Sequence, residues 1–118
     1  KIYYHKLVRD KIPQRIVASG GEYEIKTLTD KEFKKELLKK LIEEAAEVSD
    51  AVSRESLIKE LADTQEIIDN LKKIINISDK EIKDSQDEAF FKKGGFHEKL
   101  FLVWCSDTGY EDKKNFQN

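Results

Sequence analysis

Residues 29–75, TDKEFKKELLKKLIEEAAEVSDAVSRESLIKELADTQEIIDNLKKII, decide the fold. Thr29 followed by Glu32 is a capping box, which predicts a helix of about 22 residues that ends near Val52. Its apolar side chains recur at helical spacing, at Phe33, Leu37, Leu38, Leu41, Ala45, Val48 and Val52. A break at Ser53-Arg54 precedes a second helix with its own stripe, Leu57, Leu61, Thr64, Ile67, Ile68, Leu71, Ile74 and Ile75. Because the break is short, we expect the two helices to be antiparallel neighbours.

The flanking segments are shorter. We expect a helix at Lys11–Ser19, with Pro13 in its first turn, and another that opens with the Ser78 and Glu81 capping box and ends at Lys93. Residues 22–28 and 96–104 are rich in β-forming side chains and predict strands. The sequence therefore predicts a mainly α antiparallel helix bundle with small β extensions, in one domain over residues 1–106 followed by a polar tail at 107–118.

Composition narrows the class of protein. Charged residues make up 39% of the 118 positions, but 22 basic and 24 acidic side chains leave a net charge of −2, which disfavours disorder and binding of a nucleic acid polymer. No apolar run predicts a spanning helix or a secretory segment, so we expect a soluble cytoplasmic protein without membrane contact. The single cysteine, Cys105, is expected to be a small buried hydrophobe.

Acidic residues lie on the apolar faces of the two long helices. At about 100° per residue, Glu44 and Glu60 fall inside the apolar stripes, while Glu47 and Asp63 flank them and Glu43 points further outward. Antiparallel packing would bring four of these carboxylates toward one seam. Like charges in a partly dry seam must either stay protonated or hold a cation.

Oxygen ligands without a nearby histidine or cysteine select Mg²⁺ or Mn²⁺. His5 and His97 lack the spacing of metal ligands and are expected to be surface or strand residues. The competing interpretation is that the acids only pair with nearby lysines, of which Lys39, Lys40 and Lys59 are candidates. Spacing and face do not decide between these two interpretations.

The acidic pattern resembles that of a known family. Glu43-Glu44-Ala45-Ala46-Glu47, twelve intervening residues and Glu60-Leu61-Ala62-Asp63 resemble the EExxE…ExxD signature of the MazG-like nucleotide pyrophosphohydrolases. KLVRDKIP at 6–13 and KGGF at 93–96 resemble the ends of a compact subgroup related to phosphoribosyl-ATP pyrophosphohydrolase. The resemblance implies an all-α nucleoside triphosphate pyrophosphohydrolase fold, completed by a partner subunit. It also implies cleavage between the α and β phosphates to give a monophosphate and pyrophosphate.

Carried over by position, the resemblance implies that Glu44, Glu47, Glu60 and Asp63 hold Mg²⁺. The proton of the attacking water needs a base, and Glu43 and Glu47 both remain candidates. The triphosphate also needs positively charged partners, which we expect in the two basic segments at 6–13 and 93–96. The candidates are Lys6, Arg9, Lys11 and Lys93.

Two other functions remain open at this point. Phosphoribosyl-ATP hydrolysis would use the same acids, whereas a non-catalytic helical dimerisation module would pair them with lysines of a partner. A chain this short with helices this amphipathic buries a modest core, so we expect a homodimer or a higher homo-oligomer.

Overall fold

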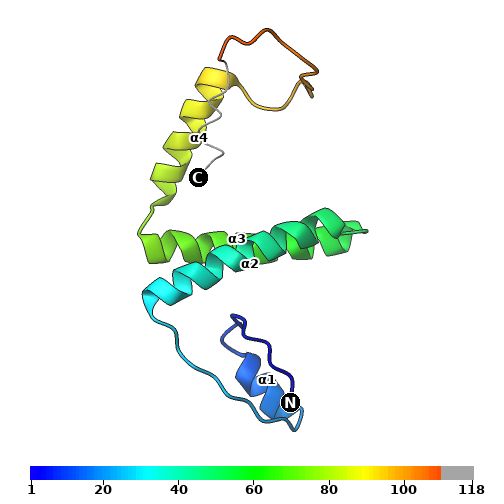
Figure 1. The fold of residues 1–118 in the computed structure, drawn as a ribbon, viewed down its shortest axis with the longest axis vertical. Helices are drawn as coiled ribbons and strands as arrows, with labels where there is room; N and C mark the ends of the chain where they lie inside the picture. The colour runs from blue at the N-terminus through cyan, green and yellow to red at the C-terminus, as the bar shows by residue number, and fades with distance from the viewer. Residues whose placement is uncertain (110–118) are drawn as a thin grey trace. The chain divides into compact units, whose positions relative to one another are not determined.

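The computed structural model describes residues 1–109, and these residues form four helices (Figure 1). The helices are α1 (Ile12–Ala18), α2 (Asp30–Asp50), α3 (Arg54–Ile75) and α4 (Asp79–Lys93). Each lies within two residues of a helix predicted from the sequence. The expectation of a mainly helical protein is therefore confirmed.

The helix starts are fixed by side-chain caps. The Thr29 hydroxyl accepts a hydrogen bond from the Glu32 backbone N–H, and the Glu32 carboxylate accepts one from the Thr29 backbone N–H. Ser53 and Ser56 form the same reciprocal pair at the start of α3. Such caps satisfy N–H groups that have no partner within the helix.

Helices α2 and α3 pack against each other as an antiparallel hairpin, because only Ala51–Ser53 connect them (Figure 1). Leu37 of α2 and Ile67 of α3 are its buried apolar side chains, with exposed fractions of 2% and 7%. Glu44 of α2 is also buried. The core of the hairpin is therefore very small, and a charged group occupies part of it.

The chain divides into two compact units, Lys1–Glu81 and Ile82–Asn118. The first contains α1, the hairpin and the first turn of α4, whose Asp79 forms an ion pair with Lys72 of α3. The second contains the remainder of α4, which ends before Gly94 at a positive φ of 77°. The division falls inside the domain expected at residues 1–106. Of the tail expected at 107–118, residues 110–118 lie outside the described part of the chain.

Both segments expected to be strands differ from that expectation. Neither residues 22–28 nor residues 96–104 form a strand, because neither pairs with another extended segment among residues 1–109. Their large apolar side chains are exposed, as at Ile25 and Phe101. Cys105 is also exposed, so the expectation that it is buried was wrong.

Within residues 1–109, no helix combines the length and the apolar composition needed to cross a lipid bilayer.

Candidate metal centre

The hairpin brings three carboxylates together. Glu44 and Glu47 lie one turn apart on α2, and Glu60 faces them from α3. One oxygen from each of the three lies within 4.8 Å of the others. The three-residue spacing places the two α2 acids on one side of the helix, and the short connection to α3 supplies the third.

Two oxygens of this cluster are buried without a hydrogen bond. Glu44 is 8% exposed, and its Oε2 has no hydrogen-bond partner among the described residues; the same holds for Oε2 of Glu60. A carboxylate oxygen that has lost water without gaining a donor is costly, and buried polar groups are normally paired. These two atoms therefore lack the hydrogen-bond donor that a buried carboxylate oxygen normally has.

Neighbouring lysines only partly compensate for the charge. Lys40 Nζ lies 3.8 Å from Glu44 Oε1, and Lys59 Nζ lies 3.7 Å from Glu60 Oε1. Both distances exceed that of a direct N–H···O hydrogen bond. Pairing with lysines thus accounts for Oε1 of Glu44 and of Glu60, but it leaves Oε2 of each without a hydrogen bond.

The mutual proximity of the acids changes the titration of Glu60. Its pKa is raised above the usual value, chiefly because its carboxyl group can share a proton with Glu47, with burial as the second cause. The ammonium of Lys59 acts in the opposite direction and favours the charged form. The cluster consequently prefers to bind a positive charge, either a proton or a metal ion.

The donor set fits a small divalent ion. Octahedral oxygens about 2.1 Å from one Mg²⁺ lie about 3.0 Å apart when adjacent and about 4.2 Å apart when opposite, so the three carboxylates would have to close around an ion by side-chain rotation. Three carboxylate ligands leave octahedral positions for water or for phosphate oxygens. The orphaned buried oxygens are the observation that makes this cluster a candidate metal centre.

Asp63, the fourth predicted ligand, lies outside this three-residue group. Its Oδ1 accepts a hydrogen bond from Arg9 Nη2 at 3.0 Å, and its Oδ2 lies 3.4 Å from Lys59 Nζ. Asp63 is one turn beyond Glu60 on the same helix, so it remains next to the cluster. In this structure its charge is shared with two cations.

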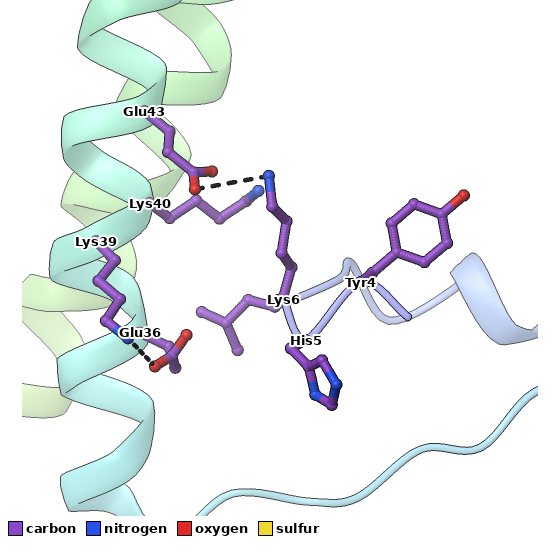
Figure 2. Close-up of a pocket in the computed structure, with 8 residues that line it drawn as sticks. Tyr4, His5, Lys6, Glu36, Lys39, Lys40 and Glu43 are labelled. Carbon is purple, nitrogen blue, oxygen red and sulfur yellow. Dashed lines mark ion pairs between the residues drawn. The ribbon is translucent and has the colours of Figure 1, made fainter. Parts of the chain in front are cut away.

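The other predicted residues are distributed around this centre or away from it. Glu43 Oε1 forms an ion pair of 3.6 Å with Lys6 Nζ, and Glu43 is exposed (Figure 2). Lys11 is exposed at the N-cap position of α1. Lys93 is the last residue of α4 and belongs to the second unit. Of the four predicted phosphate-binding residues, Lys6 and Arg9 thus contact the hairpin, through Glu43 and Asp63.

Sequence reasoning missed one feature beside the centre. Residues Tyr4–Leu7 and one face of α2 enclose a pocket of about 240 Å³ that Lys39 and Lys40 also line (Figure 2). The only local signal for it was the four-residue spacing of Lys40 and Glu44, which places both on one side of α2. The contact with the N-terminal segment has no local sequence signal.

Comparisons with protein-family models, with curated proteins and with solved structures found no match to this chain.

Proposed function

We propose that this protein is a Mg²⁺-dependent nucleoside triphosphate pyrophosphohydrolase that acts in the cytoplasm, with Mn²⁺ as an alternative metal. The observation that carries the proposal is the pair of buried oxygens of Glu44 and Glu60 without a hydrogen bond, which lie close to the exposed carboxylate of Glu47. A protein that used these positions only for helix packing would be more stable with apolar side chains there. The sequence resemblance supplies the reaction class.

In this proposal Glu44, Glu47 and Glu60 hold the ion, and Asp63 becomes a fourth ligand once its charge is released from Arg9. Bound Mg²⁺ would neutralise negative charge on the pyrophosphate leaving group and orient a water at the α phosphorus. Arg9 would then have its planar guanidinium free for a phosphate. Its present partner is the neighbouring carboxylate, which places it at the edge of the centre.

The base that takes the proton from water is Glu43 or Glu47. Glu47 belongs to the carboxylate cluster, where a metal ion would compete with the proton for its oxygens. Glu43 lies outside it and forms an ion pair with Lys6. Replacement of each by glutamine separates the two roles, because loss of the base lowers kcat while metal affinity is retained.

A second copy of the chain would complete the fold as a bundle of the pyrophosphohydrolase type. The hairpin leaves large apolar side chains exposed on both helices, namely Leu38, Ile42, Leu57, Ile58 and Leu61. Two hairpins that pack through such side chains would bury them, and a homodimer is therefore part of the proposal. The β extensions also belong to it, because a strand at 22–28 or 96–104 needs a partner strand.

The test is a product analysis with Mg²⁺ and a panel of nucleoside triphosphates that includes phosphoribosyl-ATP. The proposal expects one pyrophosphate for each monophosphate released, and loss of turnover in Glu44→Gln and Glu60→Gln. Release of orthophosphate alone would exclude cleavage between the α and β phosphates. A preference for phosphoribosyl-ATP alone would favour the histidine-synthesis alternative, and no turnover on any substrate would favour the dimerisation module.

A further inference from the structure

A pocket of about 240 Å³ lies between the N-terminal segment and α2 (Figure 2). Tyr4–Leu7 form one wall, and Glu36, Lys39, Lys40 and Glu43 of α2 form the other. The ion pair between Lys6 Nζ and Glu43 Oε1, at 3.6 Å, connects the two walls. The pocket is thus built by residues of the first unit alone.

The charged groups of the lining leave one net positive charge. Three ammonium groups, of Lys6, Lys39 and Lys40, line the pocket together with the carboxylates of Glu36 and Glu43, which form ion pairs with Lys39 and Lys6. Figure 2 shows the side chains of Lys6 and Lys40 extending toward each other beside the Glu43 carboxylate. Lys40 is the least exposed of the three, at 27% of its side chain, so its charge is the least screened by solvent.

Lys40 links the pocket to the candidate metal centre. Lys40 lines the pocket, and its Nζ also lies 3.8 Å from Oε1 of Glu44. A metal ion bound to Glu44 would weaken the hold of that carboxylate on Lys40, because the ion competes for the same negative charge. The ammonium would then be available to a ligand that extends from the metal into the pocket.

The size of the pocket limits what it can hold. Pockets that enclose whole drug-sized ligands measure about 300–1,000 Å³, so one of 240 Å³ suits a part of a nucleotide. We propose that this pocket binds the polyphosphate portion of a metal-bound ligand, with Lys6 and Lys40 as the phosphate-binding cations. The inference rests on the proposed function and adds to it the pocket that would hold the phosphates and Lys40 as a second phosphate-binding cation beside Lys6.

The test measures binding, independently of turnover. Isothermal titration calorimetry follows inorganic tripolyphosphate in the presence of Mg²⁺, and a separate titration follows Mn²⁺ alone. Loss of a charge-assisted contact in Lys40→Gln or Lys6→Gln should weaken tripolyphosphate binding about 10-fold. Lys40→Gln should leave Mn²⁺ binding unchanged or tighter, because Glu44 loses a competing cation. A merely structural role for Lys40 would weaken both.

Two controls match these variants. Lys34→Gln removes an exposed lysine of α2 that does not line the pocket, and it should change tripolyphosphate affinity less than 2-fold. Glu43→Gln breaks the same ion pair as Lys6→Gln but removes the negative partner. It should bind tripolyphosphate at least as well as the wild type, whereas a role limited to tying the two walls together would make both variants equally weak.

The outcomes separate this inference from the proposed function. If Mn²⁺ binds but Lys40→Gln, Lys6→Gln and Lys34→Gln have equal tripolyphosphate affinities, the pocket proposal is overturned and the metal centre stands. If the wild type binds no Mn²⁺ but binds tripolyphosphate through these lysines, the pocket stands and the proposed function fails. Binding of neither probe overturns both.

Discussion

The guanidinium of Arg9 and the carboxylate of Asp63 form an ion pair of 3.0 Å across 54 residues of sequence. This contact joins the segment before α1 to the middle of α3, next to the three clustered glutamates. In the proposed function, Asp63 would leave this pair to bind a metal ion. The pair therefore connects the N-terminal segment to the proposed chemistry.

Replacement of Arg9 by alanine should release Asp63 from one of its two cations. Because the pair is largely exposed on the arginine side, we expect a loss of at most about 1 kcal/mol in the free energy of unfolding. Affinity for Mn²⁺ without nucleotide should be unchanged or higher, while affinity for Mg²⁺-triphosphate should fall. Calorimetry of both ligands measures the contrast, and a parallel loss of both affinities would contradict the proposed transfer of Asp63 from Arg9 to the metal ion.

The Glu44→Gln variant should be more stable than the wild type in metal-free buffer. The substitution removes a buried charge among two others and supplies an amide that can donate a hydrogen bond to a neighbouring carboxylate. We expect a gain on the order of 1 kcal/mol, seen as a higher Tm in thermal denaturation. Glu66→Gln on α3 is a matched control outside the cluster. A lower Tm for Glu44→Gln would show that the charge is satisfied in the metal-free protein.

The free energy of unfolding should depend on pH in a way that reflects the raised pKa of Glu60. Its pKa is raised in the folded chain, so the folded state binds more protons than the unfolded state as the pH rises above 4.5, the usual glutamate value. This group therefore lowers stability progressively over that range, and the loss is complete above the folded pKa. Glu60→Gln should gain stability relative to the wild type across the same interval in chemical denaturation without metal. A constant difference at all pH values would contradict the raised pKa.

The capping residue Glu32 at the start of α2 should have the opposite effect on the pH dependence of stability. Hydrogen bonds from Thr29, chiefly its backbone N–H, lower the pKa of Glu32, so this contribution to stability is present above pH 4.5 and is lost as the pH falls through the folded pKa. Thr29→Ala should cost about 1 kcal/mol at neutral pH. The cost should shrink in acid, and thermal denaturation at the two pH values measures the change. An equal cost at both would mean that the hydrogen bond from the Thr29 hydroxyl to the Glu32 carboxylate contributes nothing to the cap.

Self-association should depend on the exposed apolar residues of the hairpin. Ile42→Glu places a charge on α2 at a position that is 73% exposed in the single chain, so only burial in an assembly would make the substitution costly. Sedimentation equilibrium should show an oligomer for the wild type and a monomer for Ile42→Glu. Val17→Glu on α1, also exposed and apolar, is the control and should remain assembled. A monomeric wild type would contradict the proposed homodimer.

Local sequence signals predicted the helices well, because caps and apolar periodicity act within a few residues. Thr29 and Ser53 start α2 and α3 where the pattern indicates, and Glu44 and Glu60 meet because a short connection makes two helices antiparallel. The long-range contacts of Arg9 and Lys6 had no such signal, since they depend on how the N-terminal segment lies on the hairpin. The strand expected at 96–104 does not form among residues 1–109, because β-forming side chains make a strand only when a partner strand is present.

The most direct test of the central claim is the binding of Mn²⁺, followed by electron paramagnetic resonance of the free ion. The account predicts that the wild type binds Mn²⁺ and that Mg²⁺ displaces it. It also predicts that Glu44→Gln and Glu60→Gln lose this binding, whereas Glu66→Gln retains it. Absence of binding by the folded wild type, or equal binding by all four proteins, would contradict a divalent metal centre between α2 and α3.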